Sequence, residues 1–299
     1  MSSHLPPRVL NWIERALPNR MLSQTQVLPG STSATLRRLD FTDSFSAVLR
    51  QFDVFPDWLE REPDLARHEA RSLERAAQSG LLTPKLIAYD ETGAEAGFPS
   101  VLMTCLPGSV QLNPPDFPAW IDQMAAALAR IHHVSHADFG WQYASYTDLN
   151  TLTVPVWSGV PQAWAQAIEL VQKTRPTFEP RFIHRDFHPA NVLWQGNQVS
   201  GVVDWVNACL GPIGADLAHC RVNLAQMYGV AAADAFRDAY AQQTGHVQEV
   251  YWDVRSFMGF VDNDDSLGVY PGWPAFGLTG LTDRLVRERL DEFLLSLGV

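Results

Sequence analysis

One stretch decides the fold of this chain, and it reads His184-Arg185-Asp186-Phe187-His188-Pro189-Ala190-Asn191. A short apolar run, Phe182-Ile183, precedes the stretch, and a second run from Val199 to Val203 ends at Asp204. The Gly196-Asn197 pair before the second run is typical of a tight hairpin turn, which folds the chain back on itself. The pattern therefore predicts a polar loop after a buried strand, followed by a hairpin that can bring Asn191 and Asp204 near each other.

The polar side chains of this region have the chemistry of phosphoryl transfer from a nucleoside triphosphate. A hydroxyl that attacks a γ-phosphate needs a carboxylate to orient it and accept its proton, and Asp186 is the candidate catalytic base. Mg²⁺ prefers oxygen ligands, which Asn191 and Asp204 supply as an amide and a carboxylate. The alternative is a plain polar loop whose side chains satisfy neighbouring backbone groups.

The stretch also contains two histidines, His184 and His188. A second catalytic base at His184 would be redundant, so we expect its ring to hydrogen-bond the loop backbone near Asp204. His188 either contacts the substrate or caps the loop, and the sequence does not rank these two roles.

Composition limits the partners that the chain can have. It has 299 residues, 46% of them hydrophobic, and a net charge of −11. No apolar stretch approaches the roughly 18–20 residues that cross a bilayer, and the N-terminus lacks the features of a signal peptide, so we expect a soluble cytoplasmic protein. The negative charge argues against nucleic acid and anionic membranes, and it suits a cationic small molecule. The sequence does not indicate the oligomeric state.

The chain changes character at Pro107-Gly108. Before this break, apolar patterns predict helices over 9–17 and 63–80, three antiparallel strands over 26–28, 34–41 and 45–52, and further strands over 86–89 and 99–105. After it, they predict helices over 117–133, 160–173, 216–227, 231–243, 250–261 and 281–297, with short strands at 182–183, 192–194 and 199–203. We place a lobe boundary at the break.

Several of these motifs resemble the aminoglycoside phosphotransferase (APH) family, whose pattern is roughly H-G-D-[LF]-H-x-x-N followed by an apolar run ending I-D-W. Here the second element is Val203-Asp204-Trp205, and Pro212 to Leu217 resembles the family's P-x-x-x-D-L. Leu128 to His132 resembles its L-A-x-L-H helix. Arg185 is typical of protein kinases, but His188, the Trp after Asp204 and the lack of an A-P-E sequence favour the small-molecule kinases.

This resemblance implies an α+β, two-lobed protein-kinase-like fold, with a small β-rich N-lobe, a larger helical C-lobe and a nucleotide cleft between them. Residues 1–106 would form the nucleotide-binding lobe, with a hinge at about 103–108. Residues 107–299 would form the catalytic and acceptor-binding lobe.

The resemblance also assigns residues around the nucleotide. Gly30, Ser31, Thr32 and Ser33 stand where the family's phosphate-covering loop would be, although an ordinary turn is the alternative. Arg50 occupies the position of a strand lysine that contacts the phosphates, and Glu69 is the matching helix acid, with Glu74 as the second choice. The alternative is an exposed arginine and a solvated helix face. In the hinge, backbone groups near Thr104 and Leu106 would bind the adenine edge, and Met103 would flank the pocket or belong to the core.

The activity implied is transfer of the γ-phosphate of ATP or GTP, with Mg²⁺, to a hydroxyl of a small molecule. An aminoglycoside or another antibiotic is one candidate acceptor, and a metabolite alcohol or sugar is the alternative. The acidic run Asp262-Asn263-Asp264-Asp265 would either bind amines of the acceptor or form a solvated turn. Because the strand lysine is missing, a nucleotide-binding pseudokinase that acts as a scaffold is the alternative of another class.

Overall fold

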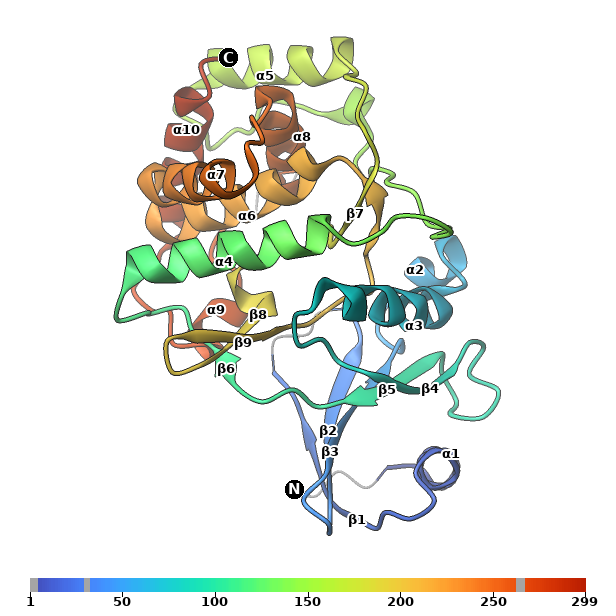
Figure 1. The fold of residues 1–299 in the computed structure, drawn as a ribbon. Helices are drawn as coiled ribbons and strands as arrows, with labels where there is room; N and C mark the ends of the chain where they lie inside the picture. The colour runs from blue at the N-terminus through green and yellow to red at the C-terminus, as the bar shows by residue number, and fades with distance from the viewer. Residues whose placement is uncertain (1–4, 30–32, 262–266) are drawn as a thin grey trace. The chain divides into compact units, whose positions relative to one another are not determined.

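The computed structural model describes residues 5–29, 33–261 and 267–299. Contacts between Cα atoms divide the chain into two compact units (Figure 1). The first unit runs to Gly108 and also holds Ser200–Asn207, and the second holds Ser109–Val199 and Ala208–Val299. The boundary after Gly108 lies at the predicted Pro107-Gly108 break. The segment 200–207 was expected in the second lobe but is grouped with the first unit.

The first unit is built on a five-stranded antiparallel sheet with the strand order β1-β2-β3-β5-β4. The strands are β1 (Leu22–Val27), β2 (Thr35–Phe41), β3 (Ser46–Gln51), β4 (Leu86–Asp90) and β5 (Ser100–Thr104). Side chains alternate between the two faces of a strand, so Ala47 and Leu49 of β3 lie on one face and Arg50 on the other. The three antiparallel strands predicted at the start of the chain are thereby confirmed.

Helices pack on this sheet through apolar faces. α1 (Pro7–Ala16) contributes Val9, Trp12 and Ile13 to a core that includes Leu39 and Leu49 of the sheet. α3 (Leu65–Ala76) packs against β4 and β5, continues as a short 3₁₀ turn, η1 (Ala77–Ser79), and ends at Gly80, whose left-handed φ of 71° suits a helix end. The short helix α2 (Pro56–Arg61) was not predicted.

The segment 200–207 is tied into the first unit by backbone contacts. Val202 donates its N–H to the carbonyl of Leu82 at 3.1 Å, and the Ser200 hydroxyl donates to the carbonyl of Pro107 at 2.8 Å. A Cβ atom at Gly201 would lie 2.8 Å from the Leu82 carbonyl oxygen, so this close approach requires glycine. The segment therefore carries Asp204 into the first unit, where Asp204 adopts a left-handed φ of 68°.

The second unit is mainly helical. Its helices are α4 (Phe117–His132), α5 (Pro161–Lys173), α6 (Ile213–Tyr228), α7 (Val230–Thr244), α8 (Val250–Val261), α9 (Gly272–Ala275) and α10 (Asp283–Ser296). α6 is buried along almost its whole length and packs against α7, α8 and α10, while α4 packs against α7 and α5 against α8 (Figure 1). α6 is thus the central helix of the unit.

Short strands complete the second unit. β7 (Arg181–Ile183) pairs antiparallel with β10 (Cys209–Gly211), and β6 (Ser109–Val110) pairs with β8 (Val192–Gln195). β9 (Gln198–Val202) follows β8 after the turn at Gly196, whose φ is 57°, and from Ser200 onward its residues belong to the first unit. The 3₁₀ turns η2 (Leu149–Thr151) and η3 (Pro189–Asn191) lie in connecting segments. Strands β6 and β10, which are two and three residues long, were not predicted.

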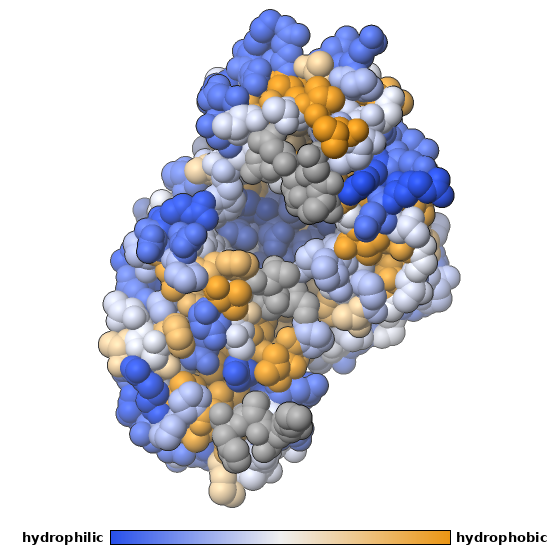
Figure 2. Space-filling model, turned by 180° about the vertical axis from the view of Figure 1, so that it is seen from behind, coloured by the Kyte–Doolittle hydropathy of each residue, from blue (hydrophilic) through white to orange (hydrophobic). Residues whose placement is uncertain are grey.

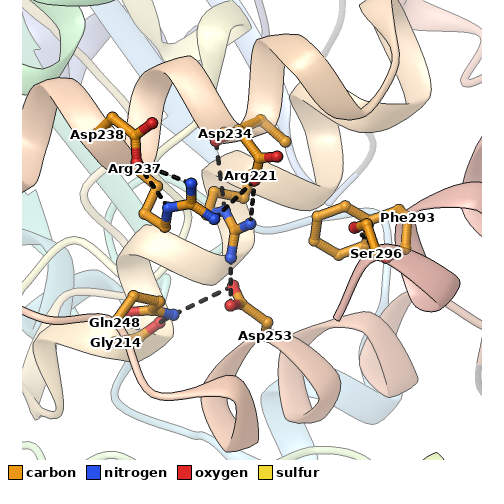
Figure 3. A network of polar contacts seen from close by, with 10 residues as sticks. Gly214, Arg221, Asp234, Arg237, Asp238, Gln248, Asp253, Phe293 and Ser296 are labelled. Carbon is orange, nitrogen blue, oxygen red and sulfur yellow. Dashed lines mark hydrogen bonds and ion pairs between the residues drawn. The ribbon is translucent and has the colours of Figure 1, made fainter. Parts of the chain in front are cut away.

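A buried ionic network joins α6, α7 and α8 (Figure 3). Arg221 of α6 pairs with Asp253 of α8 and, at 2.9 Å, with Asp234 of α7. Gln248 donates to Asp253 at 3.2 Å and to the carbonyl of Gly214 at 3.1 Å. Burial raises the pKa of Asp253 above its usual value although Arg221 acts in the opposite direction. The network fixes α6 between its neighbours.

The surface carries both polar and apolar side chains. Figure 2 shows small hydrophobic areas among hydrophilic ones on one face. Large apolar side chains that remain exposed include Met21, Phe55, Val156 and Val247, which are far apart in the sequence. Scattered apolar residues of this kind are ordinary on protein surfaces. Within the residues that the structure describes, no helix has both the length and the apolar character that crossing a membrane requires.

Candidate active site

The predicted catalytic loop follows β7 and is hydrogen-bonded to α6. Asp216, fully buried on α6, accepts the backbone N–H of His184 at 2.7 Å and also that of Arg185. Its third partner is the His132 ring at the end of α4, whose Nε2 lies 3.1 Å from Asp216 Oδ2. A buried carboxylate that accepts several hydrogen bonds is a rigid anchor. The loop backbone is therefore fixed where it leaves the strand, and Arg185 adopts a left-handed φ of 68°.

Asp186 and Asn191 are brought together in this loop. The Asn191 amide nitrogen donates to the backbone carbonyl of Asp186 at 2.8 Å and lies 3.3 Å from its Oδ2. The other carboxylate oxygen, Oδ1, lies 3.0 Å from Nε2 of His219 and 3.9 Å from Nε2 of His188. The side chain of Asp186 keeps 29% of its surface exposed, so a ligand can reach it.

The charge of Asp186 is controlled by its histidine neighbours. Burial acts to raise the pKa of Asp186, but the hydrogen bond from His219 and the charges of His188, His219 and His184 outweigh it and lower the pKa. Asp186 is therefore ionised at neutral pH and can accept a hydrogen bond from a hydroxyl.

The two loop histidines lie within hydrogen-bond reach of backbone groups. Nδ1 of the buried His184 accepts the N–H of Asp186 at 3.3 Å, a bond to the backbone of its own loop. Nδ1 of His188 accepts the N–H of Ala190 at 3.4 Å, so His188 caps the turn η3. Arg185 extends away from Asp186, donating to the carbonyl of Ala144 and to the Tyr146 hydroxyl at 3.2 Å.

In the first unit, Arg50, Glu69 and Asp204 form a second group. Arg50 Nη1 donates to Asp204 Oδ1 at 2.8 Å, and Arg50 Nε lies 3.4 Å from Glu69 Oε2. The side chains of Arg50 and Glu69 are only 3% and 1% exposed, whereas that of Asp204 is 31% exposed. The arginine is thus buried beside a helix carboxylate, and Glu74, the second choice, pairs instead with Arg71 on the surface.

The pKa of the buried Glu69 carboxyl lies near neutral pH. Burial raises its pKa to about 7, Arg50 acts to lower it, and Asp204 acts to raise it. A guanidinium can bind two carboxylates at once because its donors form a planar fork. Arg50 therefore partly offsets the cost of burying Glu69 while it also binds Asp204.

Asn191 and Asp204 have the donor chemistry that Mg²⁺ requires. The Asn191 nitrogen is used on Asp186, which leaves the amide oxygen as the atom able to bind a cation. Asp204 is partly exposed, and its carboxylate is shared with Arg50. Mg²⁺ commonly takes one or two protein oxygens together with phosphate oxygens and water. The part of the chain that the structure describes holds no cluster of three or more His, Cys, Asp or Glu side chains suited to a metal.

The structure describes only some of the other residues that were predicted to contact the nucleotide. Gly30, Ser31 and Thr32 lie outside the described residues, as do Asp262 to Asp265, and Ser33 follows the first of these gaps. Met103 is buried in β5. The N–H of Thr104 donates to the Lys85 carbonyl at 2.9 Å, so it is not available to an adenine. The side chain of Leu106 packs beside Gly201.

His219, which was not predicted as a site residue, lies on α6 beside Asp186. A single histidine in a helical pattern gives no signal of its own, but its position three residues after Asp216 places both on one face of α6. Asp291 accepts from Gly159 N–H and the Ser158 hydroxyl, each at 2.7 Å, and is thus committed to the fold.

An antiparallel β-sheet unit with a buried Arg-Glu pair, and a helical unit with an Asp-Asn loop, define a protein-kinase-like phosphotransferase fold. The model of the phosphotransferase enzyme family, APH, matches residues 25–258, and the chain belongs to this family.

Solved structures of similar fold include the aminoglycoside phosphotransferase APH(4)-Ia, with a TM-score of 0.64 and 16% identity over 97% of this chain and 98% of that one. The structure of macrolide 2'-phosphotransferase MphH from Brachybacterium faecium has a TM-score of 0.55 and 19% identity, over 83% of this chain and 86% of that one. These likenesses show the fold.

Among curated proteins, the chain is similar to homoserine kinases. It is 33% identical to the enzyme of Methylocella silvestris over 162 residues, which is 50% of each chain. It is 25% identical to that of Brucella ovis over 167 residues, 50% of this chain and 49% of the other. The chain thus matches about half the length of these curated relatives.

Proposed function

We propose that the protein transfers the γ-phosphate of ATP or GTP to a hydroxyl group of a small molecule. The observation that carries the proposal is the setting of Asp186, an ionised and accessible carboxylate whose loop is anchored by the buried Asp216. Membership of the phosphotransferase family supports the same reading.

In this proposal Asp186 accepts a hydrogen bond from the acceptor hydroxyl and takes its proton as the phosphoryl group is transferred. The hydroxyl is oriented toward the phosphorus, which accounts for most of what the protein does in phosphoryl transfer. Because its histidine neighbours lower its pKa, Asp186 is ionised and can both orient the hydroxyl and accept its proton.

Asn191 and Asp204 would bind Mg²⁺ through oxygen atoms, and the ion would neutralise charge on the β- and γ-phosphates. Arg50 would take the part of the strand lysine, because its buried guanidinium lies beside Glu69 and already binds Asp204. The loop from Gly30 to Ser33, with Met103 and the backbone near Leu106, would complete the nucleotide contacts.

The acceptor we favour is a metabolite alcohol that carries an amino group. The homoserine kinase relatives are named for an acceptor that carries both a hydroxyl and an amino group, and the net charge of −11 suits an acceptor with an ammonium group. An antibiotic acceptor, with a role in resistance, is the second candidate, because solved structures of similar fold are aminoglycoside and macrolide phosphotransferases. We place the reaction in the cytoplasm.

A phosphorylation screen tests the proposal. The full chain is incubated with γ-labelled ATP or GTP and Mg²⁺, and with L-homoserine, choline, an aminoglycoside or a macrolide in parallel. We expect labelled product from an amino alcohol, and its loss in the absence of Mg²⁺. Nucleotide binding without transfer to any acceptor would instead support the pseudokinase scaffold.

A further inference from the structure

His219 is placed by the same helix face that anchors the catalytic loop. It follows Asp216 by three residues on α6, and residues at this spacing project from one side of a helix. Asp216 accepts the backbone N–H groups of His184 and Arg185, while His219 lies against the side chain of the next residue, Asp186. One face of α6 thus contacts both the backbone of the loop and its acidic group.

The imidazole of His219 has packed neighbours that restrict its movement. Its ring centroid lies 5.0 Å from that of Phe260 on α8, with the planes inclined by 36°, and 5.8 Å from that of His188. Only 23% of the His219 side chain is exposed. The Arg221 network, two residues further along α6, fixes the helix that carries it. Nε2 is therefore held at 3.0 Å from Asp186 Oδ1.

The carboxylate of Asp186 is contacted on both oxygens by donors from different elements. The Asn191 amide lies 3.3 Å from Oδ2, and His219 lies 3.0 Å from Oδ1. Rotation about the terminal torsion of an aspartate is broad, because it joins an sp³ to an sp² carbon. A single donor at Oδ2 would leave much of that freedom, whereas two donors fix the plane of the carboxylate.

We propose that His219 is a positioning residue: it donates Nε2–H to Oδ1 of Asp186 and holds the carboxylate in the orientation that receives the acceptor hydroxyl. The inference rests on the proposed function. His219 acts through Asp186, and the hydroxyl proton passes to Asp186. An ionised carboxylate only accepts hydrogen bonds, so the His219 ring must carry its proton on Nε2.

Three variants and a double-mutant cycle test this role. His219→Leu removes the donor with little change in volume, and His219→Gln supplies an amide at similar reach. His133→Leu is the matched control, since the ring of this exposed histidine bonds the Ala129 carbonyl of its own helix. The measurements are kcat with the acceptor found in the screen, KM for ATP and the unfolding temperature.

We expect His219→Leu to lower kcat about 10²-fold, the cost of misplacing a reacting group by about 1 Å, with KM for ATP unchanged. His219→Gln should recover most of that loss, and His133→Leu should match the wild type. In single turnovers of an Asp186→Asn background, His219→Leu should have no further effect, because the group that it positions is gone.

Two results overturn the inference while leaving the proposed function intact. One is an unchanged kcat in His219→Leu when Asp186→Asn is impaired. The other is an equal loss from His219→Leu in both backgrounds, which is what general destabilisation of α6 would produce. An Asp186→Asn variant with wild-type turnover would instead overturn the proposed function, and the inference with it.

Discussion

Replacing Arg50 by methionine should destabilise the first unit by an amount that increases with pH. Methionine keeps much of the volume of the arginine stem but leaves the buried Glu69 without the guanidinium beside it. Breaking a buried ion pair on one side commonly costs about 3–5 kcal/mol. Here Glu69 can avoid that cost by keeping a proton, because burial already raises its pKa to about 7 and removal of Arg50 raises it further.

The sign follows from proton binding. A carboxyl with a raised pKa binds its proton more tightly in the folded state, so this group's contribution to stability falls as pH rises above the ordinary glutamate range. In the wild type this decrease in stability ends at about pH 7, where folded Glu69 loses its proton. In Arg50→Met the pKa of Glu69 is higher, so the stability continues to decrease above pH 7 by about 1.4 kcal/mol per pH unit. At pH 5 the variant should therefore lose only the packing of Arg50 and its pair with Asp204, and at pH 9 it should be about 3 kcal/mol less stable than at pH 5, relative to the wild type.

Urea unfolding at pH 5, 7 and 9, combined with hydrogen exchange of the α3 amides, measures this difference. Arg71→Met is the matched control, because Arg71 also pairs with a glutamate of α3 but on the exposed surface. Surface pairs contribute about 1 kcal/mol or less, so we expect a small loss with little pH dependence. A loss in Arg50→Met that is equal at pH 5 and pH 9 would refute the reasoning.

Three further changes test other parts of the site. Asp204→Asn should raise the Mg²⁺ concentration needed for half-maximal transfer, which a metal titration measures; an unchanged requirement would remove Asp204 from the metal site. Asp216→Ala leaves two backbone N–H groups of the loop unpaired, so we expect a loss of about 3 kcal/mol and faster exchange over residues 184–191. Arg221→Met leaves the buried Asp253 without its arginine partner, so we expect a loss of stability of about 3–5 kcal/mol in thermal unfolding. This loss should become smaller as pH falls, because Asp253 then takes up a proton.

Much of the fold could be predicted because it is encoded locally. The alternating runs before residue 52 gave the strands β1 to β3, and helical periodicity gave α1, α3 to α8 and α10. Gly80 was expected to end the long helix, and its left-handed φ occurs at that position. Short elements such as α2 and β10 were missed, since a few residues cannot establish a period.

The candidate site could be predicted only in part. Asp186 and Asn191 are five residues apart on one loop, so a local pattern places them together. The contact of Arg50 with Asp204 joins residues 154 positions apart, and it depends on the segment 200–207 belonging to the first unit. The burial of Glu69 was consistent with the helical spacing of its apolar neighbours, but its pKa depends on tertiary contacts. His219 had no local signal at all.

The central claim is that Asp186 orients and deprotonates the acceptor hydroxyl, and one pair of measurements tests it most directly. Asp186→Asn keeps the shape of the side chain but removes its charge. We predict that single-turnover transfer of the γ-phosphate to the acceptor falls by about 10²–10⁴-fold, while the dissociation constant for Mg²⁺-ATP stays the same. Transfer at a rate near that of the wild type would contradict the account.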